Sequence, residues 1–373
     1  MKIGISCYPT HGGSGVVASE LALQLAHLGH EVHIISYAVP FRLAEFHPNI
    51  LLHEVEVSAY PLFKYPPYAL GLATKMVEVA LEHKLEILHA HYAVPHATSA
   101  YLAKQIIGPE KVKLITTLHG TDITLVGADS SFQRVVKFSI EQSDGITVVS
   151  NYLRDRTCRD FGIKEDIDVI YNFIDSKRGL GGGNVCKREK YAPNGEAIMM
   201  HASNFRPVKR VTDVVRIFAR VCEVMPAKLI LIGEGPERIL AQQVIHELGI
   251  KSNVIFLGQA DFIDDLLKCA DIFLLPSEQE SFGLAALEAM NCSVPVIGSN
   301  TGGIPEVVEH GKNGYLFDVG EIKQMADACI GMLQDPEKLK SMRESARERA
   351  LKYFGIETIM PQWMNFYERI LSK

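Results

Sequence analysis

The chain has 373 residues, of which 47% are hydrophobic and 22% are charged, a composition typical of globular proteins rather than disordered or fibrous ones. This length exceeds one ordinary hydrophobic core and predicts two domains. The 38 Lys and Arg residues against 44 Asp and Glu residues give a net charge of −6. Such a balance argues against a general nucleic-acid or anionic-membrane binder.

The seven cysteines are scattered, odd in number and form no CxxC pair. This pattern predicts reduced thiols in a cytoplasmic protein rather than a disulfide framework. The first strand follows Met1 without a signal region, and no apolar run approaches the roughly 20 residues that a membrane helix needs.

The first half of the chain predicts alternating strands and helices. A strand over 2–7, a glycine-rich loop, a helix over about 15–28 and a strand over 31–36 form a βαβ start. The loop lacks GxGxxG and GK[ST], which argues against a dinucleotide or P-loop site. Gly15, at the helix N-terminus, is still placed to admit a sugar or phosphate against bare backbone. Further strands are predicted over 87–91, 113–118, 145–149 and 169–171.

Polar and aromatic side chains follow several of these strands. Residues 58–72 are rich in aromatics and proline and predict an irregular surface loop, in which Lys64 is the one cation. His89 and His91 share a strand face, but no cysteine or carboxylate stands near them, so we do not expect a metal there. Tyr92 and His119 follow strand ends, where parallel sheets bind ligands.

The second half begins near residue 172 and includes a glycine-rich segment, 178–186, that predicts a flexible connection. A strand over 197–202 precedes a loop with several cations, a plausible diphosphate clamp. Strands over 228–232 and 253–257 end in two more polar loops. The side chains of interest in these loops are Asn204, Arg206, Lys209, Arg210, Glu234 and Gln259.

The stretch 271–303 carries the most specific pattern. A buried strand over 272–275 leads to a loop containing Glu280, and a helix then begins near Phe282 or Gly283 and contains Glu288. A helix N-terminus with a bare glycine is an anion site. A strand over 313–318 and helices over 321–333, 336–353 and 356–371 complete the chain.

Two glutamates eight residues apart around SFGLAAL, followed by GGIPE, resemble the signature of the retaining glycosyltransferases of family four. The resemblance implies that Glu288 holds the nucleotide ribose and that Glu280 contacts the donor sugar. It implies that the amides of Phe282, Gly283 and Leu284 hold the diphosphate. It also assigns Arg206 and either Lys209 or Arg210 to the diphosphate and places the loops of Glu234 and Gln259 beside the base.

The resemblance further implies an α/β fold of the GT-B kind, with two doubly wound parallel-sheet domains facing across a cleft. The acceptor-binding domain would be 1–171, with the helix over 356–373 packed back on it. The nucleotide-sugar-binding domain would be 172–355. Polar residues at the carboxyl ends of both sheets would then share one cleft.

The expected chemistry is a metal-independent sugar transfer with retention, in which His119, Glu280 and Arg206 are the catalytic candidates. A helix N-terminus and cations would stabilise the departing diphosphate, a role that a metal fills in other enzymes. The DxD pattern of Asp166 and Asp168 stands before a strand of the other half and predicts a solvated turn. We therefore expect neither a metal nor another cofactor.

Stretches such as CYPTHGGSGVVASELA, HAHYAVPHA and TTLHGTDIT are similar to family members that transfer N-acetylglucosamine from UDP-N-acetylglucosamine to L-malate, which starts bacillithiol biosynthesis. Malate is a small dianion, so its pocket should offer cations and hydroxyl donors. The acceptor candidates are Ser14, Lys64, Tyr92, Thr117, Arg134 and Asn151.

Other readings remain open at this point. A family-four transferase acting on a lipid or an inositol phosphate would keep the same donor half, but a lipid acceptor would call for a basic aromatic face that the sequence lacks. A UDP-sugar epimerase of the GT-B fold would use no acceptor. We expect small-molecule substrates and no nucleic-acid partner, and the sequence leaves a homo-oligomer possible.

Overall fold

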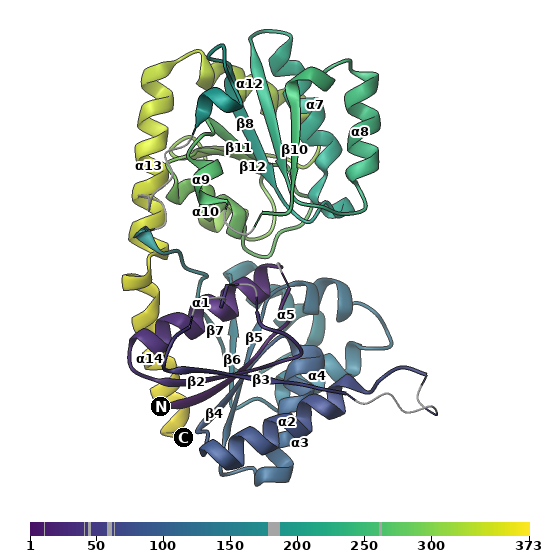
Figure 1. Ribbon diagram of the computed structural model, residues 1–373, viewed down its shortest axis with the longest axis vertical. Coiled ribbons are helices and arrows are strands. Elements are labelled where there is room, and N and C mark those ends of the chain that lie inside the picture. Colours follow the sequence, from purple (N-terminus) through teal and green to yellow (C-terminus); the bar gives the residue numbers. More distant parts are fainter. Residues whose placement is uncertain are drawn as a thin grey trace. The chain divides into compact units, whose positions relative to one another are not determined.

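The computed structural model describes residues 1–10, 12–40, 42–43, 46–57, 62, 64–177, 187–260 and 263–373. The chain forms two compact units, Met1–Tyr171 with Met360–Lys373, and Asn172–Ile359. Each unit is a parallel sheet covered by helices (Figure 1). The predicted flexible connection at 178–186 lies outside the described residues, as does part of the predicted aromatic loop, 58–61 and 63.

The described strands of the first unit form a seven-stranded parallel sheet in the order β3-β2-β1-β4-β5-β6-β7. They are β1 (Lys2–Ser6), β2 (Glu31–Ser36), β3 (Ile50–Glu54), β4 (Ile87–His91), β5 (Lys113–Leu118), β6 (Gly145–Val148) and β7 (Ile167–Val169). The helical elements are α1 (Gly13–His27), α2 (Tyr68–His83), η1 (Ala93–Ala97), α3 (Thr98–Ile107), η2 (Asp122–Val126), α4 (Gln133–Glu141) and α5 (Asn151–Phe161). The strand order reverses between β1 and β4.

The central strands are buried because both of their faces are covered by helices. All five residues of β4 are buried, and the four of β6 likewise. Strand β3 was not predicted from the sequence, because it lies at the sheet edge and keeps Leu51 and Leu52 exposed. The last strand begins at Ile167, two residues before the predicted start.

The described strands of the second unit form a six-stranded parallel sheet in the order β10-β9-β8-β11-β12-β13. They are β8 (Ala197–Ala202), β9 (Ala227–Ile232), β10 (Val254–Gly258), β11 (Ile272–Leu275), β12 (Val296–Ser299) and β13 (Gly314–Phe317). The helices are α7 (Val211–Cys222), α8 (Arg238–Glu247), α9 (Asp264–Leu267), α10 (Leu284–Asn291), α11 (Ile304–Val307), α12 (Ile322–Leu333) and α13 (Pro336–Phe354), with short turns η3 (Arg188–Lys190), η4 (Pro207–Lys209) and η5 (Lys251–Asn253). The last helix, α14 (Ile356–Leu371), begins in this unit and continues into the first. Here the order reverses between β8 and β11.

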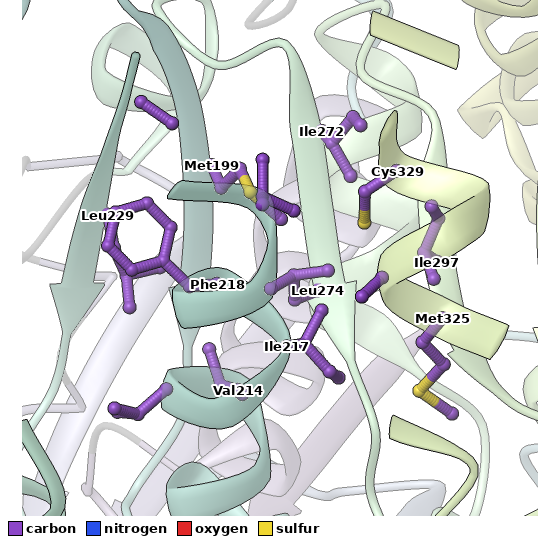
Figure 2. Packing of buried hydrophobic residues seen from close by; sticks show 14 of the residues in the cluster. Met199, Val214, Ile217, Phe218, Leu229, Ile272, Leu274, Ile297, Met325 and Cys329 are labelled. Atoms are coloured by element: carbon purple, nitrogen blue, oxygen red, sulfur yellow. The ribbon is translucent and has the colours of Figure 1, made fainter. Parts of the chain in front are cut away.

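The core of the second unit forms where α7 and α12 pack on one face of this sheet (Figure 2). Apolar residues recur along α7 at helical spacing, so Val214, Ile217 and Phe218 all face the strands. Met325 and Cys329 of α12 complete the layer. Burying a side chain the size of Phe218 contributes roughly 1.5–3 kcal/mol, so this layer holds the strand ends in place.

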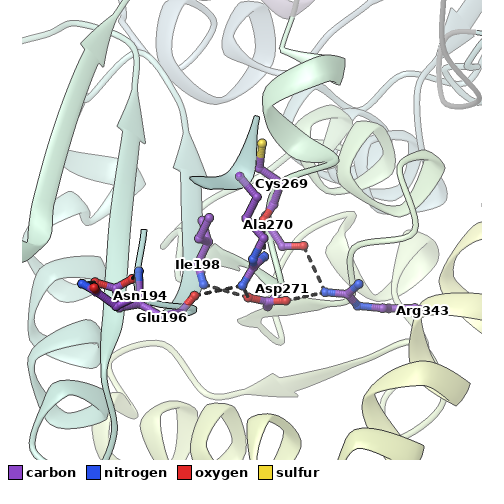
Figure 3. A network of polar contacts seen from close by, with 8 residues as sticks. Asn194, Glu196, Ile198, Cys269, Ala270, Asp271 and Arg343 are labelled. Carbon is purple, nitrogen blue, oxygen red and sulfur yellow. Dashed lines mark hydrogen bonds and ion pairs between the residues drawn. The ribbon is translucent and has the colours of Figure 1, made fainter. Parts of the chain in front are cut away.

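A buried carboxylate also joins the strands (Figure 3). Asp271 accepts a hydrogen bond from the amide of Ile198 at 2.8 Å and pairs with Arg343 of α13 at 2.6 Å. Arg188 contacts the same carboxylate at 2.5 Å. These bonds fix the start of β11 against β8, the two strands between which the order reverses.

The C-terminal helix α14 belongs to the first unit from Met360 onward. The Tyr367 hydroxyl lies 2.8 Å from His89 Nδ1, and Trp363 is buried against the same imidazole. Arg369 donates to Asp168 at 2.6 Å. Asp168 lies in β7, and its ion pair with Arg369 anchors this helix. The prediction of a solvated turn at Asp168 is thereby corrected.

The cysteines differ from the expectation in one respect. Five carry free thiols, at positions 7, 158, 222, 292 and 329. Cys269 takes part in a disulfide, so the prediction that all thiols are reduced was wrong, and Cys186 lies outside the described residues. Among the described helices, none combines the length and the apolar character needed to cross a membrane.

Candidate active site

The donor candidates gather where the strand order of the second sheet reverses. Strands β8 and β11 are neighbours there, with Met199 opposite Ile272, and the loops after them carry the cations and the glutamates of the motif. The amide of Glu278 donates to the carbonyl of Val208 at 2.8 Å. The reversal point of an open parallel sheet is where such folds bind ligands.

Two glycines shape the glutamate loop. The amide of Gly303 donates to the Glu280 carbonyl at 2.9 Å. A Cβ on Gly302, whose φ is +60°, would lie 1.9 Å from that carbonyl oxygen, and one on Gly303 would lie 2.4 Å from the Ser281 oxygen. Only glycine allows this approach, so the Gly-Gly pair fixes the backbone over 280–283.

Helix α10 follows that loop and begins at Leu284, one or two residues after the predicted start. Gly283 precedes it in the left-handed conformation, with φ of 99°. The first backbone N–H groups of a helix have no partner within the helix, so they are available to an anion. Phe282 is buried against Phe354, and Glu288 is half-buried one turn into the helix.

An ion pair joins the cation loop to the glutamate loop. Lys209 Nζ pairs with Glu280, whose carboxylate also accepts from the Ser277 hydroxyl at 3.3 Å. Both charged side chains are mostly buried, with 20% and 13% of their side-chain surface exposed. Arg206 lies exposed in the cation loop that follows β8. This cluster presents cations and one carboxylate beside a helix N-terminus.

Arg210, the other candidate for the second cation, contacts helix α7. Its guanidinium is directed to Asp213 in the first turn of α7, at 2.6 Å, and Arg216 contacts the same carboxylate at 3.0 Å. Of the two alternatives for the second cation, Lys209 is therefore the one that contacts the motif glutamate.

The remaining donor candidates lie in the neighbouring loops. Glu234 follows β9 and pairs with Arg238 one turn further on, while Gln259 follows β10 and is exposed. The amide of Gly233 donates to the Gly258 carbonyl at 2.7 Å, which joins these two loops. Asn204 follows β8 and is exposed.

In the first unit, Tyr92 and His119 come together at the carboxyl ends of β4 and β5. Their rings stack at 5.9 Å, and the Tyr92 hydroxyl bonds the Thr121 hydroxyl. Tyr8, after β1, meets Tyr92 edge-on at 5.5 Å and His96 at 4.6 Å. Three strand ends thus contribute to one aromatic cluster.

His119 is held in place on both sides. Its Nε2 lies 3.0 Å from His91 Nδ1, and its backbone amide donates to Asp122 Oδ1 at 3.2 Å. Burial lowers the pKa of His119 to about 3, so the imidazole is neutral near pH 7. It can donate or accept a hydrogen bond but carries no charge.

Ser14 and Gly15 lie in the first turn of α1. A Cβ on Gly15 would lie 2.5 Å from the Tyr8 carbonyl oxygen and 2.6 Å from that of Thr10. The glycine therefore lets the loop after β1 fold tightly over the helix N-terminus. Ser14 is half-buried beside it.

The structure does not bring the other acceptor candidates into this cluster. Thr117 is buried in the sheet, where its hydroxyl lies 2.7 Å from His89 Nε2 and 2.6 Å from the Thr147 hydroxyl. Lys64 is exposed over the Tyr65 ring. Arg134 is exposed on α4, and Asn151 opens α5 and donates to the Tyr171 hydroxyl at 2.7 Å.

Sequence reasoning missed the residues that support His119. Asp122 is fully buried, and its carboxylate accepts the amides of His119 and Gly120. Burial raises the pKa of this carboxyl to about 6, against the opposing effect of those amides. The available signal was the polar Asp122 three residues after His119, in the loop that follows β5.

Two family models match the two halves of the chain. The model described as Glycosyltransferase Family 4 matches residues 11–178, and the model described as Glycosyl transferases group 1 matches 186–349. The chain is 49% identical over 375 residues to an N-acetyl-alpha-D-glucosaminyl L-malate synthase of Bacillus anthracis, covering 100% of this chain and 97% of that protein. The chain belongs to glycosyltransferase family four. The family predicted from the sequence is thereby confirmed.

Two solved structures show the same fold. Sucrose-phosphate synthase of Thermosynechococcus elongatus superposes with a TM-score of 0.81 at 21% identity, covering 100% of this chain and 99% of the other. Anabaena Alr3699/HepE in complex with UDP and glucose gives 0.83 at 23% identity, covering 99% and 100%. The prediction of two Rossmann-like domains of the GT-B kind is confirmed, and the protein is a glycosyltransferase.

Proposed function

We propose that this enzyme transfers N-acetylglucosamine from UDP-N-acetylglucosamine to the hydroxyl of L-malate with retention, the first step of bacillithiol biosynthesis. The observation that carries the substrate assignment is the 49% identity over the whole chain to the Bacillus anthracis synthase. The geometry of the two sheet edges supports the chemistry of such a transfer.

In the donor half, the N-terminus of α10 would bind the diphosphate through its backbone N–H groups. Arg206 and Lys209 would supply the positive charge, and Glu288 would hold the ribose. Glu280, positioned by Lys209, would accept hydrogen bonds from the sugar hydroxyls. Such preorganised charges act where negative charge develops as the glycosidic bond breaks.

The proposed step is an attack from the face that the diphosphate leaves. The bond between the sugar C1 and the diphosphate oxygen breaks as the malate oxygen bonds to C1, and the departing phosphate oxygen takes the hydroxyl proton. The products are UDP and N-acetylglucosaminyl malate. Glu280 is a positioning group in this step and forms no covalent bond, and we propose that the step needs no metal.

In the acceptor half, we propose Ser14, Tyr92 and the neutral His119 as the residues around the reacting hydroxyl. Lys64, Arg134 and Asn151 stay proposals for the malate carboxylates. We leave out Thr117, because its hydroxyl is bonded within the buried sheet.

The direct test is UDP release from UDP-N-acetylglucosamine in excess EDTA, with and without L-malate, followed by mass spectrometry of the product. We expect release that depends on malate and a product with the mass of the malate glycoside. UDP without a malate adduct would instead indicate a hydrolase or an epimerase, and loss of turnover in EDTA alone would overturn metal independence.

A further inference from the structure

Three histidines from separate elements of the first unit meet away from the strand ends that carry the candidate site. His33 lies on β2, His53 on β3 and His83 in the last turn of α2, elements labelled in Figure 1. One ring nitrogen from each lies within 4.8 Å of the other two. Among the described residues, no other group of three histidines, cysteines or carboxylates is so arranged.

The separations are close to those of a metal site. His33 Nδ1 lies 2.9 Å from His53 Nε2, and the ring of His83 lies 4.3 Å from that of His33 and 5.4 Å from that of His53. Zinc–nitrogen bonds of about 2.0–2.1 Å in a tetrahedral site place ligand nitrogens roughly 3.3 Å apart. The ligand nitrogens lie 2.9 Å apart for His33 and His53 and within 4.8 Å for all three, a range that includes this value, so modest side-chain rotations would admit an ion.

A carboxylate already orients the buried member of the group. His33 Nε2 lies 2.9 Å from Glu31 Oε1, which also accepts from Lys2 Nζ at 3.2 Å. An Nε2–H donated to Glu31 leaves the Nδ1 lone pair directed toward His53. Metal-binding histidines are typically oriented in this way, with the second ring nitrogen donating to a carboxylate.

The position of the group indicates what a bound ion would do. Val32 and Ile35 of β2 pair with Ile50 and His53 of β3, and β3 is the exposed edge strand. Ile35, which shares a strand face with His33, packs with residues of α2. An ion held by all three elements would therefore tie the edge strand and the helix to the sheet.

We propose that His33, His53 and His83 bind one divalent transition-metal ion through three imidazole nitrogens, with Glu31 orienting His33 and water completing the coordination. Imidazole ligands favour zinc and its neighbours, such as cobalt, nickel and copper, over magnesium or calcium. The site is structural and is separate from sugar transfer, because none of its residues belongs to the candidate active site.

The experiment uses the full chain without an affinity tag, stripped with a chelator and titrated with Co²⁺ and then Zn²⁺. We expect one equivalent of Co²⁺ to give the intense visible absorption of a four-coordinate site, and Zn²⁺ to displace it and raise the melting temperature. His53→Gln and His83→Gln should each weaken Zn²⁺ binding by roughly 100-fold or more, and Glu31→Gln by about 10–100-fold.

The matched control is His27→Gln, because His27 lies 5.0 Å from His47, ring to ring, in a pair of histidines outside the three-histidine group. This variant should bind Zn²⁺ as the unmodified chain does. Circular dichroism without metal identifies variants that fail to fold, and Glu31→Gln then serves in their place. Absence of stoichiometric Co²⁺ binding, or equal Zn²⁺ affinity in folded His53→Gln and the unmodified chain, would overturn the proposal.

Discussion

Glu280 and Lys209 determine the charge distribution of the donor half. The pair lies between two loops, and most of both side chains is shielded from water, so their attraction is weakly screened. In the proposed function, Lys209 would hold Glu280 in position and also face the diphosphate at the N-terminus of α10. Its loss would then affect sugar and diphosphate together.

Lys209→Ala is expected to lower kcat/KM for the donor by about 100-fold or more, since a preorganised charge at the leaving group typically contributes a factor of 10²–10³. Steady-state rates of UDP formation measure this. Lys228→Ala is the control, because that ammonium contacts the Ser252 carbonyl at 3.0 Å, in a different part of the unit. A decrease of less than threefold in the Lys209 variant would remove this residue from the mechanism.

Glu288→Ala is expected to weaken UDP binding by about tenfold, the usual magnitude for one lost hydrogen bond to a charged group. Isothermal titration calorimetry with UDP measures the change directly. Glu247→Ala, at the exposed end of α8, is the matched carboxylate control. Unchanged UDP affinity in the Glu288 variant would contradict the ribose contact.

At the scale of elements, the turn that carries Gly302 and Gly303 determines where the glutamate loop lies. Its role is steric, because a Cβ on either glycine would collide with a backbone atom of residues 280–282. The turn thus couples the end of β12 to the loop after β11. Helix α10 begins at Leu284, directly after that loop.

Gly302→Ala is expected to reduce both activity and stability. The left-handed φ costs an alanine about 1–2 kcal/mol, and its Cβ would also displace the Glu280 carbonyl. Gly311→Ala is the control, because its φ is also positive, at +81°, but nothing lies within 4 Å of the added carbon. Urea unfolding measures the stability of each variant, and kcat measures its activity. Only Gly302→Ala should lose activity. Equal activity in the two variants would argue against the steric role.

The sequence predicted the donor half better than the acceptor half. Glu280, Phe282 and Glu288 belong to one contiguous motif, so their proximity follows from local geometry. The surroundings of Thr117 and His119 depend on contacts with residues far away in the chain, such as Thr147 and His91, which spacing does not reveal. The edge strand β3 was missed for a related reason, because its exposed leucines lack the pattern of a buried strand.

For the whole molecule, buried histidines govern the response to acid. His89 and His96 are fully buried, and burial lowers the pKa of each to about 3. Below about pH 6.5 the unfolded chain binds protons that the folded chain excludes, so stability falls as the pH falls toward 3. Asp122, with its pKa raised to about 6, acts in the opposite direction and stabilises the protonated fold below that pH.

The free energy of unfolding should therefore decrease by about 3 kcal/mol or more between pH 7 and pH 5.5, because His89, His96 and His119 together outweigh one carboxyl. Urea denaturation followed by circular dichroism at the two pH values measures it. His246→Gln, an exposed histidine on α8, should leave the decrease unchanged. Equal or greater stability at pH 5.5 would contradict the role assigned to the buried imidazoles.

The central claim is a retaining transfer to malate, and the most direct measurement is the proton NMR spectrum of the purified product. From the α-linked donor UDP-N-acetylglucosamine and L-malate, we predict a malate O-glycoside whose anomeric proton has the small coupling constant of an α linkage. A large coupling constant, typical of a β linkage, would show inversion. A sugar without malate attached would contradict the proposed acceptor.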